Sequence, residues 1–228
     1  GEPIAAKRWS DAQKRKIHDS RVDGTRRVVE AIDRDGVPVL LSGSGVGYYG
    51  DCGDEVLTES RGPGDDFLAH MAIDWEAAAL SAARARVVLL RTGIVLSPAG
   101  GALKKLLPLF KLGLGGRMGS GKQWVSWIAL HDHVRAMERL LTSDVRGPVN
   151  VVAPNPVTNA AQAKTLGRVL HRPAVLPTPS IGPKLVLGSE LASTLLGDSQ
   201  RATPKVLLED GFEFRSPDLE GALTSLLR

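Results

Sequence analysis

Two glycine-rich stretches have spacings that occur in phosphate-binding loops. Gly45–Gly50 reads G-x-G-x-x-G after an apolar run, which is the spacing of a dinucleotide-binding fingerprint. That loop works when its third glycine opens a helix whose N-terminus receives a pyrophosphate. Residues 51–55 read Asp-Cys-Gly-Asp-Glu, which does not start such a helix. We therefore reject this stretch as the phosphate loop.

The second stretch, Gly116–Lys122, reads GRMGSGK and has the spacing of a Walker A loop. Gln123 stands where that loop needs a Ser or Thr for magnesium, and the residues that follow predict a strand instead of a helix. The match is therefore a coincidence. The sequence also contains no G-x-S-x-G, which argues against an α/β-hydrolase.

His131, Asp132 and His133 are side chains that can bind metals. A further ligand outside this adjacent run is not evident in the sequence, so we expect no metal site. Instead we expect Asp132 to cap, or to place a charge at, the N-terminus of the following helix. Cys52 is the only cysteine, which excludes an intrachain disulfide and a thiolate metal cluster.

The 228 residues carry 29 Lys and Arg against 25 Asp and Glu, and much of this excess lies near the N-terminus. Such a basic face could attract a nucleotide phosphate, although a solvated helix face is the simpler interpretation. No signal peptide or apolar run of about 20 residues is present. We expect a cytosolic protein with a small-molecule substrate and with neither a nucleic-acid nor a membrane partner. The oligomeric state stays open.

Apolar periodicity predicts alternating helices and strands over the first two thirds of the chain. A helix opens with the capping box Ser10–Gln13 and stops at Gly36. The pattern then predicts strands at 37–41, 86–90, 123–128 and 149–152, a helix over 65–83, and a helix with Val134, Met137, Leu140 and Leu141 on one face. This alternation favours a parallel sheet covered on both faces.

After Pro154 the prolines break the chain into short pieces. Thr203-Pro204 predicts the start of a short helix that ends at Gly211, and Ser216-Pro217 predicts the cap of another. We therefore expect two parts, a Rossmann-type domain over 1–153 and a small C-terminal, substrate-side subdomain over 154–228.

Several motifs occur in one order along the whole chain. They are Arg8-Trp9, 19–25 (DSRVDGT), 42–50 (SGSGVGYYG), 74–76 (DWE), 90–96 (LRTGIVL), 113–116 (GLGG), 119–123 (GSGKQ), 127–128 (WI) and 200–205 (QRATPK). Together they resemble the atypical extended short-chain dehydrogenase/reductases, the nucleoside-diphosphate-sugar epimerase-like family with a C-terminal domain of unknown function. The resemblance implies an α/β fold with a Rossmann-type doubly wound parallel sheet, and NADP(H) in preference to NAD(H) as cofactor.

Members of this family begin with a phosphate loop and two βαβ steps, which need on the order of 60 residues. Gly1–Pro3 resembles the segment just after the fourth strand. We therefore expect the Rossmann-type sheet to be N-terminally incomplete here, and the 228 residues to bind NADP(H) weakly or not at all without those units.

Ligands of open α/β sheets lie outside the carboxyl ends of the strands. Residues 42–47 follow one predicted strand here, and residues 91–95 follow the next. The resemblance implies that residues 91–95 lie against the nicotinamide half of the cofactor. The resemblance also makes Arg21 a cofactor-facing residue. The expected cofactor-binding residues are Arg21, Ser42, Gly43, Gly45, Arg91, Thr92, Gly93 and Val95. We expect Gly45→Val to fill space near the nicotinamide and to require a disallowed φ.

The family transfers hydride with a Tyr-x-x-x-Lys pair, which the sequence lacks; Leu68 and Ala72 occupy the expected positions. Ser44 is the best match to the catalytic serine. Tyr48 is the remaining candidate proton donor, with a wall of the cofactor pocket as its other interpretation. Ala129 and His131 stand where the family carries a His and an Asp, and Asp132 is retained.

Two functions are consistent with this pattern. One is an NADP(H)-dependent oxidoreductase or epimerase acting on a small or nucleotide-linked substrate. Ser44, the glycine loop and Arg91 favour it. The other is a non-catalytic NADP(H)-binding sensor or scaffold, which the missing Tyr-Lys pair favours.

Overall fold

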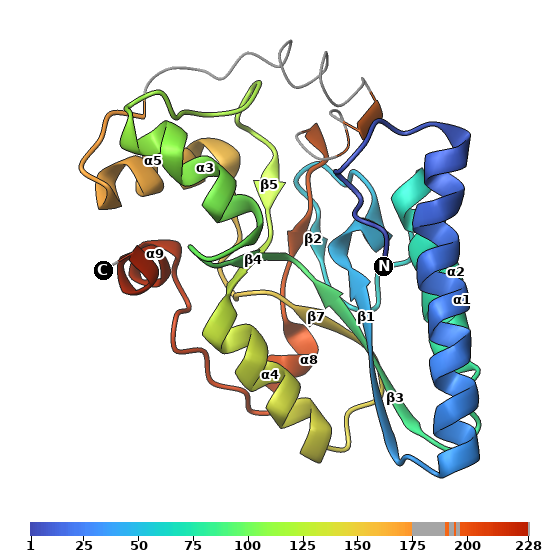
Figure 1. The fold of residues 1–228 in the computed structure, drawn as a ribbon. Coiled ribbons are helices and arrows are strands. Elements are labelled where there is room, and N and C mark those ends of the chain that lie inside the picture. Colours follow the sequence, from blue (N-terminus) through green and yellow to red (C-terminus); the bar gives the residue numbers. More distant parts are fainter. Residues whose placement is uncertain (175–189, 192–193, 195–196, 228) are drawn as a thin grey trace.

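A computed structural model describes residues 1–174, 190–191, 194 and 197–227 (Figure 1). Its first helix, α1 (Asp11–Asp35), begins where the Ser10 hydroxyl accepts a hydrogen bond from the Gln13 backbone N–H, and it ends at Gly36 with φ +68°. The Gln13 side chain donates to Glu2 instead of returning to Ser10, so half of the predicted capping box forms. The reciprocal half is lost because the N-terminal segment offers a carboxylate.

The central sheet is parallel and has the strand order β1 (Val39–Gly45), β3 (Arg86–Thr92), β7 (Gly147–Val151). Successive residues of β3 point to opposite faces. Val87 and Leu89 pack against α1 and α2 (Phe67–Leu80), whereas Val88 and Leu90 pack against α4 (Leu130–Thr142) and α8 (Lys205–Glu209). Figure 1 shows the helices on these two sides. The predicted sheet covered on both faces is therefore confirmed.

The chain leaves this sheet at Gly93 and continues as β4 (Ile94–Leu96), which pairs with β6 (Trp127–Ala129). The single strand predicted at 123–128 is therefore wrong. It is two strands, because β5 (Trp124–Val125) pairs separately with β8 (Val157–Thr158). Ser126 separates the two strands, and its hydroxyl donates to the Gln200 carbonyl and accepts from the Ala202 N–H.

The C-terminal region joins the domain through β9 (Arg201–Ala202), which pairs with β2 (Val56–Leu57). Three further helices, α3 (Gly101–Lys111), α5 (Asn159–Val169) and α9 (Leu219–Leu227), share an apolar cluster with Trp127. Neither α3 nor α5 was among the predicted helices. The helix predicted to be capped at Ser216 begins later, because Asp218 accepts the hydrogen bond from the Gly221 N–H.

The buried stripe of α4 differs from the predicted face. Its buried residues are Asp132, Ala136 and Leu140, whereas Val134 and Leu141 are 45% and 51% exposed. Asp132 lies in the first turn but makes no cap. Its carboxylate accepts from the N–H groups of residues 215 and 216 instead, and so anchors the C-terminal segment. In the ranges described, no cluster of residues could hold a metal ion. None of the helices in those ranges combines the length and apolarity needed to cross a membrane.

Gly93 gives a first test of this architecture. A Cβ at Gly93 would lie 2.6 Å from the Ser126 carbonyl oxygen and 2.8 Å from the Val152 side chain. Gly93→Ala should therefore lower the free energy of unfolding by about 1–3 kcal/mol, the range of an overpacked core, as measured by urea denaturation. Gly24→Ala, which meets no atom within 4 Å in α1, is the control and should be neutral or stabilising. Equal effects of the two changes would contradict the close approach at Gly93.

Candidate functional site

The carboxyl edge of the central sheet brings together the residues that the sequence analysis placed after two different strands. In the β1–β3 register, Ser44 lies beside Arg91 and Gly45 beside Thr92. A short 3-10 helix, η1 (Val46–Tyr49), follows β1. Gly45 has φ −156°, and a Cβ there would make only an ordinary contact, 3.7 Å from the Thr92 carbonyl oxygen. The expectation that Gly45→Val requires a disallowed φ is therefore wrong.

A buried ion pair joins β3 to α2 at this edge. Arg91 Nε donates to Glu76 Oε1 at 2.9 Å, and Arg91 Nη2 donates to Glu76 Oε2 at 2.8 Å. The two side chains are 4% and 7% exposed. Ser44 Oγ donates to Glu76 Oε1 at 2.7 Å, so the carboxylate accepts three hydrogen bonds. Burial lowers the pKa of Arg91, but the hydrogen bonds that Arg91 donates to Glu76 and Tyr49 raise it by more, so the pKa is raised overall and Arg91 stays charged.

Two tyrosines complete the surroundings of Arg91. The Tyr48 ring lies against the guanidinium, with its centroid 3.4 Å from Cζ. The Tyr49 hydroxyl accepts from Arg91 Nη1 at 3.2 Å and donates to Asn150 Oδ1 at 2.7 Å. Burial raises the pKa of Tyr49 although Arg91 opposes it, so this phenol stays neutral. The Asn150 amide in turn donates to the carbonyls of Leu57 and Thr203, which extends the network to β2 and to the segment after β9.

The predicted catalytic residues Ser44 and Tyr48 thus both contact the Arg91–Glu76 pair, and their catalytic roles stay predictions. Arg21 lies elsewhere: its Nη1 donates to the carbonyls of Glu2 and Ile17, and its guanidinium lies over the Trp75 ring. The structure does not bring it to the Arg91 network. Its role toward the cofactor also stays a prediction.

The remaining predicted cofactor residues have mainly packing contacts. The Ser42 side chain is buried, and a Cβ at Gly43 would lie 3.0 Å from the Trp75 ring. Thr92 Oγ1 donates to the Leu90 carbonyl, and Val95 packs against the apolar cluster that contains Leu90 and Ile128. These contacts show how the residues pack within the protein. Contact of the same residues with a cofactor stays a prediction.

A cleft of about 670 Å³ opens beside the carboxyl edge. Val46 and Gly47 of η1 and Ile94 of β4 line it, next to the predicted residues, none of which is part of its described lining. Leu68, which the sequence predicts at the position of the family's tyrosine, also lines the cleft. The other walls come from α3, from β5 and its flanking residues, from α5, and from the segment that contains Thr194, Asp198 and Gln200.

Asp198 is the functional candidate that sequence reasoning missed. It lines the cleft and makes no hydrogen bond to any residue that the structure describes. Asp51 and Asp66 lie nearby and are held by backbone donors, Asp51 by the Ser199 and Gly53 N–H groups and Asp66 by that of Ala69. Burial, followed by the charges of Asp66 and Asp51, raises the pKa of Asp198 to about 7. The three carboxylates are far apart in sequence, so no local motif reveals them.

The fold and this site define the class of protein. A parallel α/β sheet with a cleft at its carboxyl edge is the arrangement of Rossmann-type nucleotide-binding proteins. Residues 1–153 match the NAD dependent epimerase/dehydratase family, and residues 178–226 match a domain of unknown function, DUF1731. The chain belongs to the NAD dependent epimerase/dehydratase family. The predicted resemblance is therefore confirmed.

Several known proteins are similar to nearly the whole of this chain. The epimerase family protein Mb2239 of Mycobacterium bovis is 44% identical over 98% of this chain and 75% of its own length. The human epimerase family protein SDR39U1, solved with NADPH, is 35% identical with a TM-score of 0.93, over 99% of this chain and 79% of that one. A nucleoside-diphosphate sugar epimerase from Corynebacterium glutamicum is 37% identical with a TM-score of 0.76, over 97% of this chain and 44% of that one.

The buried ion pair predicts a large stability effect. Glu76→Gln keeps the size of the side chain but leaves the Arg91 charge buried without a counter-charge, so the free energy of unfolding should fall by roughly 3–5 kcal/mol. Chemical denaturation measures this loss. Glu138→Gln, at an exposed position of α4, is the matched control and should change stability by less than about 0.5 kcal/mol. A similar small effect at Glu76 would contradict the importance of the pair.

Asp198 should titrate near neutrality, which NMR of its side-chain carboxyl carbon can measure. Asp51→Asn keeps an acceptor for the Ser199 N–H but removes one negative charge, so it should lower the Asp198 pKa; Asp65→Asn, at an exposed position, should not. Because the folded-state pKa is the higher one, the wild type should lose stability as pH rises from 3.8 to about 7. Asp198→Asn should abolish that loss. A midpoint near 4 would contradict this account.

Proposed function

We propose that the protein is an NADPH-dependent oxidoreductase or epimerase-like enzyme that acts on a small or nucleotide-linked substrate. The observation that carries this proposal is the cleft at the carboxyl edge of β1 and β3, where Val46, Gly47 and Ile94 form one wall. Family membership and the NADPH bound by human SDR39U1 support the choice of cofactor.

The residues of this wall fit the nicotinamide end of such a cofactor. Gly47 has no side chain at the lining, and a Cβ there would already lie 3.4 Å from Leu68. The backbone of η1 can therefore approach a flat ring closely. Val46, Gly47 and Ile94 would hold this end, and a bound nicotinamide would supply or accept a hydride.

Reduction of a carbonyl also requires a proton at its oxygen, and oxidation of an alcohol requires its removal. A group whose pKa lies near the working pH does both. Asp198 faces the cleft and has no hydrogen-bond partner among the described residues, so we assign it this role. Ser44 and Tyr48 are the alternatives, although Ser44 donates to Glu76 and Tyr48 lies against Arg91.

A second function, the non-catalytic NADP(H)-binding sensor or scaffold, is favoured by one observation. Leu68 and Ala72 occupy the positions of the family's tyrosine and lysine, and Leu68 presents an apolar side chain to the cleft. Such a protein would bind NADPH but not oxidise it in the presence of any carbonyl compound.

The test, on a protein that also carries the N-terminal phosphate-loop units of the family, combines calorimetric titration with NADPH and NADPH oxidation over a panel of aldehydes, ketones and nucleotide sugars. We expect binding and turnover, with a fall of about 10²–10⁴-fold in kcat for Asp198→Asn and unchanged NADPH affinity. Tyr48→Phe and Ser44→Ala should each cost less than tenfold. A larger loss for either of these two, with Asp198→Asn active, moves the proton-transfer role to that residue. Binding without any turnover favours the sensor function.

A further inference from the structure

The charges at the cleft are few and unevenly placed. Among the described residues that line it, Lys105 and Asp198 are the charged ones; the others are apolar, amide-bearing or hydroxyl-bearing. Asp51 and Asp66 add negative charge on the side of Asp198. Arg201 follows Gln200 in sequence, but its guanidinium lies over the Trp124 ring at 4.2 Å and is not part of the lining.

We infer that the substrate of this cleft is a small, uncharged and mainly apolar carbonyl compound or alcohol, and not a nucleoside-diphosphate sugar. The inference rests on the proposed function and names the substrate class for the same site. The lining and its charges carry it.

A nucleoside diphosphate brings two phosphates, which proteins bind with arginine forks, lysines or helix N-termini. Lys105, an exposed residue of α3, is the single cation. The first N–H groups of α5 already bond to Gln123, Gly121 and Thr158, so the helix donors left at the lining are those of α3, at Gly101 and Ala102. From Pro173 to Gln200 the sequence contains one basic residue, Lys184, which lies outside the described residues. At the described lining, a diphosphate would therefore meet one cation and one helix N-terminus against the Asp198 carboxylate, with Asp51 and Asp66 adding negative charge behind it, which disfavours a ligand with two phosphates.

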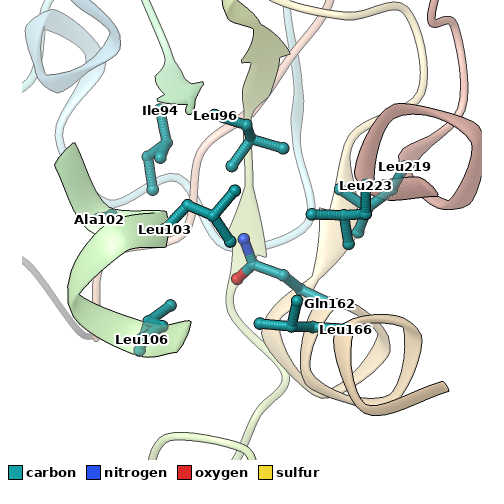
Figure 2. Close-up of a pocket in the computed structure, with 9 residues that line it drawn as sticks. All are labelled: Ile94, Leu96, Ala102, Leu103, Leu106, Gln162, Leu166, Leu219 and Leu223. Atoms are coloured by element: carbon teal, nitrogen blue, oxygen red, sulfur yellow. The ribbon is translucent and has the colours of Figure 1, made fainter. Parts of the chain in front are cut away.

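An apolar part of the cleft contains one polar side chain that has no hydrogen-bond partner among the residues described, that of Gln162. A small pocket of about 10 Å³ adjoins it and shares Ile94, Ala102, Leu106 and Gln162 with the cleft lining. Figure 2 shows the Gln162 amide reaching from α5 into a space lined by leucines. This space holds about one methyl group or one water molecule.

Gln162 differs from the other amides of the cleft. Gln200 donates to the Gly50 carbonyl, Gln123 donates to that of Met118, and the Asn159 carbonyl oxygen accepts from the Met118 N–H. Within the described residues, the Gln162 amide has no such partner. A single amide among leucines matches a ligand with an apolar body and one oxygen atom.

Direct binding tests this inference separately from turnover. Ligand-observed NMR on the protein, with and without NADPH, compares 2-nonanone with UDP-glucose as probes. We expect 2-nonanone to bind at least tenfold more tightly. Gln162→Met keeps the volume but removes the amide, so it should weaken 2-nonanone roughly fivefold, the value of one net hydrogen bond. Ala161→Met, exposed on the same helix, should leave the affinity unchanged.

The outcomes separate the two proposals. Tighter binding of UDP-glucose, or binding of neither probe, overturns the substrate class. Equal loss in the two methionine variants overturns the role of Gln162. Binding of 2-nonanone without NADPH oxidation by any carbonyl compound leaves the substrate class standing and overturns the proposed enzyme activity.

Discussion

The fold at the carboxyl edge depends on placing one positive charge, that of Arg91, in the interior. Burying an isolated charge costs desolvation free energy, and neighbouring groups must offset this cost with an opposite charge and with hydrogen bonds. Glu76 supplies both from α2, and Ser44 and Tyr49 add contacts from β1 and η1. Because these contacts are directional, they determine how α2 and η1 lie against β3. The wall of the cleft formed by Leu68, Val46 and Gly47 therefore takes its position from the ion pair.

Much of the central fold could be predicted from the sequence because its cause is local or periodic. The run Val87–Leu90 is apolar at every position, which identifies a strand buried on both faces, and Gly36 ends α1 in the left-handed region as expected. The errors arose where tertiary contacts override local pattern. Ser126 splits one predicted strand because its hydroxyl bonds to residues 200 and 202.

The candidate site was less predictable. The sequence indicated which strands end at the site, and the register places Ser44 beside Arg91. It did not indicate that Arg91 and Ser44 bond to Glu76, because that contact depends on how α2 packs. Asp198 owes its raised pKa to burial and then to the charges of Asp66 and Asp51, which come near it only in the folded chain. The domain division at residue 153 and the roles of Arg21, Ser44 and Tyr48 stay predictions.

The passage of the chain through Gly93 constrains how such a protein can diversify. This residue joins β3, in the middle of the central sheet, directly to β4, whose Ile94 lines the cleft. That wall is therefore a continuation of the core and cannot shift without disturbing the sheet. The opposite walls, on α3 and α5, contribute exposed or half-buried side chains such as Ala102, Lys105 and Gln162. Over evolutionary time, a new substrate preference is most readily acquired by exchanging these side chains, while the backbone at Gly93 stays the same.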